Sequence, residues 1–399
     1  MIKRDLQSVF NRISRFPVVV VLGPRQSGKT TLVRDVFKDH LYVSLEEPDM
    51  REVIISDPKR FLRERENKVG IIFDEFQYAP ELLSYIQIES DAKDRPGYFV
   101  LTGSQNFLMN QTITQSLAGR AGILTLLPLS IHELEADGRV NSIDDSILKG
   151  GYPRIYDKNV EPYDLYPSYI HTYIERDVRQ LITVENLKTF QKFLKLCAGR
   201  VGQALNITDL ATSCGISQIT ANKWLSLLEA SYIIFLLKPY FGSFKKRVTN
   251  TPKLYFYDVG LVCSLLSIRT KEDLMVSPFR GAIFESFIIA DFHKQYYNMG
   301  FEPPLYFWRD KNGRIEVDCL IEQANKIIPV EIKSGETIVK DFFSSLGQWS
   351  GIVGMDPADG YIVYGGSITM AGAGGKVIGW QEAGSLVEQV EKARNIVYP

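Results

Sequence analysis

The sequence predicts an α/β protein with a parallel sheet and flanking helices at the amino end, a helical module in the middle and a second α/β domain at the end. Three observations predict this architecture. An apolar, β-branched run over 18–22 leads directly into a glycine-rich loop and then into a helical pattern. Another apolar run, over 69–73, ends in Asp74 and Glu75. Beyond residue 300, short apolar runs carry acidic residues at the alternate spacing that strands require.

Composition narrows the class of protein. The chain has 399 residues, of which 45% are hydrophobic and 23% charged, an ordinary profile for a globular protein of two or three domains. A net charge of −1 excludes a global field that attracts nucleic acid or membranes, so such affinity would need a local patch. The four cysteines include no CxxC pair, which argues against a structural zinc site. No segment approaches the ~18 apolar residues of a membrane span, so we expect a cytoplasmic protein without a membrane partner.

The glycine-rich loop fits the pattern G-x-x-x-x-G-K-[ST], which is typical of a P-loop NTPase. Its backbone N–H groups would surround the phosphates at the start of a helix. Lys29 would lie against the β- and γ-phosphates as a catalytic residue, and the Thr30 hydroxyl would bind Mg²⁺. We therefore expect ATP and Mg²⁺ as cofactors, with the nucleotide bound by Gly23, Pro24, Arg25, Gln26, Ser27, Gly28, Lys29, Thr30 and Thr31.

The acidic pair after the strand at 69–73 fits the Walker B pattern, in which a buried strand delivers carboxylates beside the phosphates. Asp74 would hold Mg²⁺, directly or through water, and Glu75 would polarise the attacking water as the catalytic base. The alternative is an acid pair at a loop that caps a helix.

An ordered set of motifs covers nearly the whole chain and resembles the bacterial and archaeal AAA+-like ATPases of the AAA_14 type with a C-terminal DUF4143 region. The resemblance implies a P-loop core, a winged-helix module and a restriction-endonuclease-like terminal domain. The expected boundaries are 1–155 for the ATPase domain, 156–195 for a helical linker or lid, 196–280 for the winged helix and 281–399 for the nuclease-like domain. The motifs are GPRQSGKTTL, IIFDEFQYAP, YFVLTGSQNF, SLAGRAGILTLLPLSIHEL, GGYPRIY, YIERDV, KLYFYDVGL, FRGAIFESFI, EVDCLIE and IPVEIKSG.

Two further catalytic candidates lie in the first domain. A strand over 97–103 ends at Ser104, which resembles the AAA+ sensor that contacts the γ-phosphate or the water; Thr102 and Gln105 are rivals, and a plain turn is the alternative. Arg120 precedes a fifth strand expected over 123–129. It would stabilise transition-state charge in this chain or, in a homo-oligomer, in a neighbour, unless it is a solvated surface residue.

The middle of the chain carries a helix-turn-helix pattern. Asp209 to Ala211 belongs to the first helix, Gly215 permits the turn, and Ser217 caps a second helix over 218–228. Two strands, over 232–237 and 253–257, would bracket a wing. From 196 to 250 there are six Lys or Arg and two Asp or Glu, a balance that suits a DNA backbone. The residues expected to contact double-stranded DNA are Gln218, Asn222, Lys223, Lys245, Lys246 and Arg247.

The winged helix and the Arg176–Asp177 pair of this middle region each allow a second interpretation. A winged helix can also act as a lid or a protein-docking surface. Arg176 and Asp177 form either a solvated ion pair or an arginine that reaches a neighbouring nucleotide.

The end of the chain resembles a PD-(D/E)xK nuclease core, with Val317 at the place of the proline. Glu285 from a helix, with Asp318 and Glu331 from adjacent strands, would hold Mg²⁺, and Lys333 would be catalytic. The alternative is an E-x-K pattern on a solvated strand face.

Together these features predict an Mg²⁺-dependent ATPase that acts on DNA or is regulated by it, with an appended domain for phosphodiester cleavage. The alternatives are a nucleotide-gated switch or a docking scaffold whose nuclease-like domain is inactive.

Overall fold

The computed structural model describes residues 2–104, 116–174, 187–241, 251–310, 312–323 and 326–393, and the chain divides into two compact units. The first unit contains residues 1–128 with the short segments Ala230–Tyr232 and Tyr297–Phe301. The second unit contains 129–229, 233–296 and 302–399.

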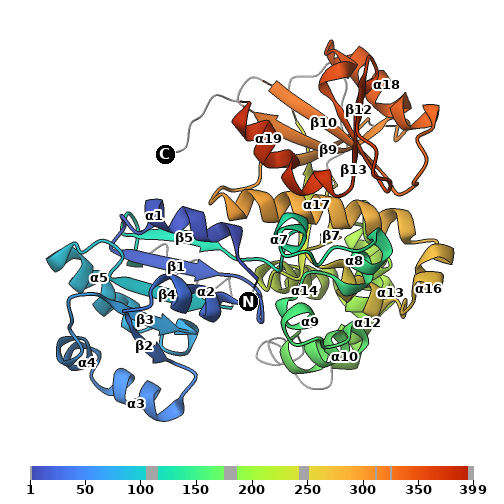
Figure 1. The fold of residues 1–399 in the computed structure, drawn as a ribbon. Coiled ribbons are helices and arrows are strands. Elements are labelled where there is room, and N and C mark those ends of the chain that lie inside the picture. Colours follow the sequence, from blue (N-terminus) through green and yellow to red (C-terminus); the bar gives the residue numbers. More distant parts are fainter. Residues whose placement is uncertain are drawn as a thin grey trace. The chain divides into compact units, whose positions relative to one another are not determined.

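The first unit is built on a five-stranded sheet of order β2-β3-β4-β1-β5, in which every neighbouring pair is parallel. These strands lie side by side in blue to teal in Figure 1. All residues of β1 are buried, as expected for a strand covered on both faces. The fold class predicted for this region is confirmed. The strands are β1 (Val18–Leu22), β2 (Leu41–Ser44), β3 (Ile71–Asp74), β4 (Phe99–Gly103) and β5 (Ala121–Thr125).

Helices cover this sheet and complete its core. Val19 and Val21 of β1 pack in one cluster with Leu32 and Val33 of α2, and Leu6 comes from the amino-terminal segment. The amino-terminal segment therefore covers the sheet. The helical elements are η1 (Asp5–Val9), α1 (Phe10–Ile13), α2 (Lys29–Val36), α3 (Pro48–Ser56), α4 (Pro58–Glu64), η2 (Phe76–Tyr78) and α5 (Leu82–Lys93).

The fifth strand begins two residues earlier than expected and ends at Thr125. Leu126 donates its N–H to the carbonyl of Leu22 at 2.7 Å, and the chain then leaves the sheet. Leu126, Leu127 and Leu129 are nevertheless buried. The apolar run therefore continues past the end of the strand because its side chains are buried in a core. The hydrophobic pattern alone does not distinguish such a buried segment from a strand.

The second unit begins with a helical region in which Asp258 is a central polar residue. Its carboxylate accepts hydrogen bonds from the Gly151 N–H at 2.7 Å and the Tyr166 hydroxyl at 2.7 Å, and it caps α15 through the Leu261 N–H at 3.2 Å. The helices are α7 (Ile131–Ala136), α8 (Ile143–Lys149), α9 (Pro153–Asp157), α10 (Pro162–Tyr169), the π-helical η3 (Ile170–Ile174), α12 (Leu187–Ala198), α13 (Ile207–Cys214), α14 (Gln218–Ala230), α15 (Val259–Leu265) and α16 (Lys271–Val276).

The second unit also contains an eight-stranded mixed sheet of order β12-β13-β11-β10-β9-β8-β6-β7. In the sequence, the long helix α17 (Arg280–Asn298) lies between strands β7 and β8. The predicted wing strands β6 and β7 are antiparallel, and β6 also pairs with β8, so one sheet continues across residue 280. The remaining elements are β6 (Ile234–Pro239), β7 (Lys253–Phe256), β8 (Leu305–Arg309), β9 (Glu316–Gln323), β10 (Lys326–Lys333), η5 (Lys340–Phe343), α18 (Ser344–Val353), η6 (Pro357–Asp359), β11 (Tyr361–Tyr364), β12 (Met370–Gly372), β13 (Gly375–Gly379), η7 (Glu382–Ser385) and α19 (Leu386–Lys392).

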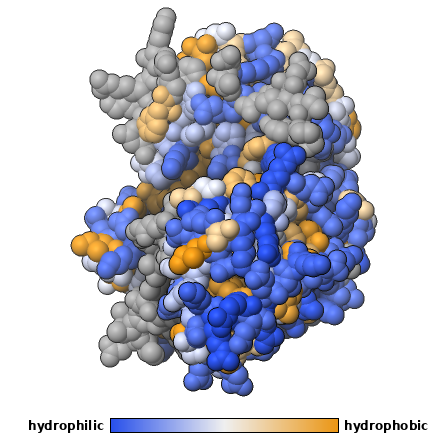
Figure 2. All heavy atoms as spheres, turned by 90° about the vertical axis from the view of Figure 1, so that its left-hand side faces the viewer, coloured by the Kyte–Doolittle hydropathy of each residue, from blue (hydrophilic) through white to orange (hydrophobic). Residues whose placement is uncertain are grey.

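Surface hydropathy is mixed. On the face drawn in Figure 2, hydrophilic residues prevail and hydrophobic ones form small separate groups. Within the described part of the chain, no helix combines the length and the apolar character needed to cross a membrane.

Candidate functional site

The loop between β1 and α2 curls because two of its residues adopt left-handed backbone conformations. Gln26 has φ of 61° and Gly28 has φ of 95°, and Gly28 is the N-cap of α2. The first N–H groups of a helix have no partner inside the helix, so α2 presents donors to the loop. A Cβ at Gly23 would lie 2.1 Å from the Leu126 carbonyl oxygen, so this position requires glycine.

The side chain of Lys29 lies inside this loop. Its Nζ donates to the carbonyls of Gly23 at 3.0 Å and Pro24 at 2.8 Å. Burial lowers the pKa of Lys29 to about 8, against the opposing charges of Glu75 and Asp74. The loop therefore holds an ammonium group beside the helix N-terminus, which is an arrangement suited to a polyphosphate.

Arg4, which no motif indicates, braces the loop from the amino-terminal segment. It is buried, and its guanidinium donates to the Ser27 carbonyl at 2.7 Å and to the Leu127 carbonyl at 2.7 Å. It therefore connects the phosphate loop to the chain that follows β5.

The carboxylate of Asp74 accepts hydrogen bonds from hydroxyl groups on three elements of the first unit. Thr30 Oγ1 from α2 lies 2.9 Å from Oδ1 and 3.0 Å from Oδ2, and the Tyr42 hydroxyl from β2 donates to Oδ2 at 2.7 Å. Thr102 Oγ1 from β4 donates to Oδ1. Burial and the contact with Asp74 raise the pKa of Tyr42 well above its usual value. Thr30 and Asp74 are brought together as predicted, whereas Tyr42 was not expected in the site.

These oxygen atoms fit a magnesium ion. Mg²⁺ prefers oxygen ligands and takes one or two of them from carboxylates, with substrate phosphates and waters supplying the rest. The Thr30 hydroxyl and the Asp74 carboxylate would hold it at the carboxyl edge of the sheet. Among the residues that the structure describes, no group of three or more His, Cys, Asp or Glu side chains is arranged to bind a metal by itself.

Glu75 follows β3 with a left-handed φ of 55°. Ser104 Oγ donates to Glu75 Oε2 at 2.8 Å, and the Gln77 amide donates to the same oxygen and lies 3.0 Å from Ser104 Oγ. The Glu75 N–H also donates to Thr102 Oγ1 at 3.1 Å. Ser104 thus contacts the predicted base, and Gln77 contacts both Glu75 and Ser104. Gln105 lies outside the described residues.

Arg120 lies at the end of the sheet opposite to the phosphate loop. It precedes β5, and its carbonyl accepts the N–H of Val18, the first residue of β1, at 3.1 Å. Its guanidinium pairs with Asp91, with NH2 at 2.9 Å from Oδ2. Since the phosphate loop follows the last residue of β1, Arg120 is not brought to the loop within this chain. A role in another chain stays a prediction.

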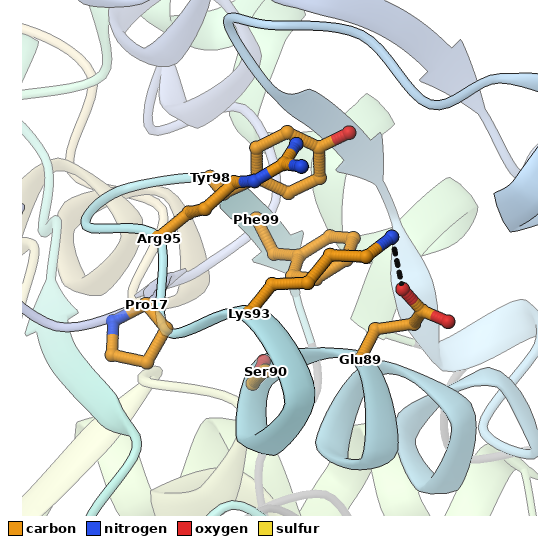
Figure 3. A pocket seen from close by; sticks show the side chains of 7 residues that line it. All are labelled: Pro17, Glu89, Ser90, Lys93, Arg95, Tyr98 and Phe99. Carbon is orange, nitrogen blue, oxygen red and sulfur yellow. Dashed lines mark ion pairs between the residues drawn. The ribbon is translucent and has the colours of Figure 1, made fainter.

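A small pocket also lies at the amino end of the sheet, next to Pro17 and Phe99 (Figure 3). Lys93 Nζ pairs with Glu89 at 2.7 Å, and the Arg95 guanidinium lies over the Tyr98 ring at 5.1 Å. Both cations also pair with Glu66. The pocket is therefore separate from the phosphate loop, and its positive charges are already neutralised.

In the helix-turn-helix segment, Ser217 Oγ accepts the Thr220 N–H at 3.1 Å, as predicted for a cap. Gln218, Asn222 and Lys223 are all exposed on α14, as expected for a presented face. Gln218 Nε2 donates to Thr208 Oγ1 at 2.9 Å. The remaining residues predicted for this region lie outside the described ranges: Arg176, Asp177, Lys245, Lys246 and Arg247.

The predicted nuclease residues lie on α17, β9 and β10. Asp318 Oδ2 accepts the Ile332 N–H at 2.8 Å, and Lys333 Nζ lies 2.7 Å from Glu331 Oε2 and 3.7 Å from Asp318 Oδ2. Burial raises the pKa of Glu285 to about 7 and that of Glu331 to about 8, and the charge of Asp318 adds to both shifts.

Glu285 has different partners from the other acids. Its Oε1 accepts from Lys253 Nζ at 3.0 Å and from the Tyr255 hydroxyl. Each of the three acids pairs with a lysine, and within the described residues they do not form a group arranged to hold a metal ion.

Comparisons with known proteins agree with the order of the regions. An AAA domain matches residues 15–135, a domain of unknown function (DUF8612) matches 140–272, and another (DUF4143) matches 280–382. The Mycobacterium tuberculosis protein named "Uncharacterized protein Rv2008c" is 30% identical over 339 residues, which are 84% of this chain and 74% of that protein. A Methanocaldococcus jannaschii protein, "Uncharacterized protein MJ1637", is 21% identical over 382 residues, covering 82% and 78%.

Among solved structures, the Walker-type ATPase PABY2304 of Pyrococcus abyssi is similar at 16% identity, covering 67% of this chain and 96% of that chain with a TM-score of 0.45. The family matches and the similarity to the mycobacterial protein agree with the motifs in their order along the sequence. The chain therefore belongs to the AAA_14 family of P-loop proteins that carry a C-terminal DUF4143 region.

Proposed function

We propose that this protein binds ATP with Mg²⁺ at the carboxyl edge of the first sheet and hydrolyses it. The observation that supports the proposal most is the contact between Thr30 and Asp74, with Glu75 next in sequence and bonded to Ser104. A hydroxyl, a carboxylate for the metal and a second carboxylate for the water are the groups that this reaction needs.

Each residue has a separate task in the proposed reaction. The N–H groups of the loop and Lys29 bind the β- and γ-phosphates, while Thr30 and Asp74 hold the metal. When bound, Mg²⁺ neutralises charge on the phosphate oxygens. Glu75 orients the attacking water and accepts its proton. Ser104 fixes the Glu75 carboxylate through its hydrogen bond of 2.8 Å.

Replacing the proposed base tests this proposal. Glu75→Gln keeps the shape of the side chain but removes its basicity, so we expect hydrolysis at least ~10²-fold slower with ATP binding retained. Glu81→Gln, an exposed acid after η2, is the matched control and should turn over normally. Near-normal hydrolysis by Glu75→Gln would reject the assignment of the base.

A second proposal concerns DNA, and the observation that favours it is the exposed face of α14. Gln218, Asn222 and Lys223 present hydrogen-bond donors and a positive charge there, which suits a helix in the major groove. We expect duplex DNA to change the rate of ATP turnover and to bind less tightly as salt rises. The double variant Asn222→Ala/Lys223→Ala should lose both effects while its basal turnover is unchanged. A switch that does not touch DNA predicts no duplex binding even at low salt.

A further inference from the structure

Lys253, the first residue of β7, is a buried lysine that contacts two acids of the second unit, Glu285 and Glu316. Its exposed fraction is 3%. Its Nζ lies 3.0 Å from Glu285 Oε1 and also pairs with Glu316 Oε1. The ring of Phe307 lies beneath the ammonium, with its centroid 5.4 Å from Nζ. The lysine therefore reaches α17 and β9 at once, and an apolar ring limits the access of water.

Each of the four acids, Glu285, Glu316, Asp318 and Glu331, pairs with a basic side chain of the second unit. Glu285 Oε1 accepts from both Lys253 and the Tyr255 hydroxyl, which occupies its two lone pairs. Glu316 Oε2 lies 3.2 Å from Arg309 Nε. Lys333 serves the other two acids, Asp318 and Glu331. The carboxylates are thus neutralised by basic side chains of the chain itself.

One fully buried oxygen of these acids has no partner in the described part of the chain. Glu331 Oε1 is buried and has no hydrogen-bond partner among the described residues. In the ranges that the structure describes, no group of three or more Asp, Glu, His or Cys side chains is arranged to hold a metal, and Mg²⁺ requires near-octahedral coordination by oxygen ligands. A divalent ion beside Lys253 would also face an ammonium group at short range in a poorly screened interior.

We propose that Lys253 is a built-in cation, whose ammonium neutralises Glu285 and Glu316 in place of a divalent ion. The terminal domain then keeps its acids as a structural ion-pair group that connects β7, α17 and β9, and it does not cleave phosphodiesters with a metal at this place. This inference is independent of ATP hydrolysis in the first unit.

The proposal predicts that removing the ammonium creates a metal site. All proteins carry Asp74→Asn, so that the candidate ATP site contributes no metal binding, and Mn²⁺ is titrated by electron paramagnetic resonance without nucleotide. In this background we expect Lys253→Met to bind one additional Mn²⁺ per chain. Adding Glu285→Gln to that variant should abolish the additional site. Lys326→Met, which removes an exposed lysine of β10 paired with Asp359 at 2.9 Å, should bind no more than the background.

Two results would overturn the proposal. The first is a folded Lys253→Met variant, checked by circular dichroism and cooperative melting, that binds no additional Mn²⁺. The second needs no change at Lys253: Mn²⁺ binding in the background protein that Glu285→Gln removes. Nicking of supercoiled plasmid with Mg²⁺ or Mn²⁺ is a separate readout on the unaltered protein, for which we expect none. Nicking that disappears in Lys333→Ala would contradict the proposal.

Discussion

Thr30 at the start of α2 and Asp74 at the end of β3 meet through the Thr30 hydroxyl, which lies 2.9 Å from Oδ1 and 3.0 Å from Oδ2 of the carboxylate. The two residues are 44 positions apart in the sequence. Parallel strands bring them together, because the carboxyl ends of β1 and β3 are on the same edge of the sheet. This contact places the two proposed metal ligands beside the phosphate loop.

Tyr42→Phe should destabilise the first unit. The substitution removes a hydroxyl that donates to Asp74 at 2.7 Å, and loss of a hydrogen bond to a charged group costs about 1.5 to 3 kcal/mol in buried settings. Because Tyr42 is only half-buried, we expect about 1 kcal/mol, measured by urea unfolding. Tyr163→Phe, at a 59% exposed side chain, is the control. Equal stability of the two variants would show that the Tyr42 contact contributes nothing.

Ser104→Ala should slow turnover without weakening ATP binding. The serine contacts Glu75 rather than the phosphate loop, so its loss disorders the base and leaves the nucleotide contacts intact. One hydrogen bond to a carboxylate corresponds to about tenfold in rate. Steady-state kinetics should therefore show a lower kcat at an unchanged dissociation constant. A weaker ATP affinity at full kcat would instead assign Ser104 to ground-state binding.

Arg4→Met should loosen the phosphate loop. The arginine donates to two carbonyls from a buried position, and leaving such acceptors unpaired costs about 1 to 3 kcal/mol each. We expect lower stability together with weaker ATP binding, measured by thermal unfolding with and without MgATP. Arg15→Met changes an exposed arginine of the same segment and should alter neither. Unchanged ATP affinity in Arg4→Met would confine the role of Arg4 to stability.

The buried acid Asp291 on α17 should make the second unit sensitive to pH. Its carboxylate accepts the Ile131 N–H at 2.7 Å, and burial raises its pKa from 3.8 to about 6. Between these values the native carboxyl keeps a proton that the unfolded chain releases, so stability falls as pH rises through the window. Two pKa units correspond to about 3 kcal/mol.

A comparison with Asp291→Asn isolates this effect, because the variant does not titrate at that position. The difference in unfolding free energy, wild type minus variant, should decrease by up to about 3 kcal/mol from pH 4 to pH 7. Denaturant unfolding across this range measures it. A difference that stays constant with pH would mean that Asp291 titrates normally.

The sequence predicted the phosphate loop, Asp74, Glu75 and Ser104 because each stands at a fixed place relative to a buried strand. Tyr42 and Arg4 were not predicted, since Tyr42 reaches the site through the order of the strands and Arg4 through a buried side chain. Gln77 was also missed, although it stands only two residues after Glu75. Tyr42 contacts Asp74 because β2 is next to β3 in the sheet. An apolar strand pattern contains no information about that neighbour.

The second unit shows the same limit. The two-residue spacing of Glu331 and Lys333 predicted that they share one face of a strand, and their side chains form an ion pair in the structure. Lys253 was assigned only to a strand, because its sequence environment resembles any edge of an apolar run. Its role depends on β7 joining the sheet that contains β9, an arrangement that no local pattern encodes.

Calorimetric titration of the full chain with ATP in the presence of Mg²⁺ measures whether the loop from Gly23 to Thr30 binds a triphosphate, as we propose. We expect saturable binding of one nucleotide per chain, weakened at least ~10-fold in Lys29→Ala because the loop loses its ammonium group. Folded protein that shows no saturable binding of ATP, or a Lys29→Ala variant that binds it as tightly as the wild type, would show that this loop does not bind the triphosphate.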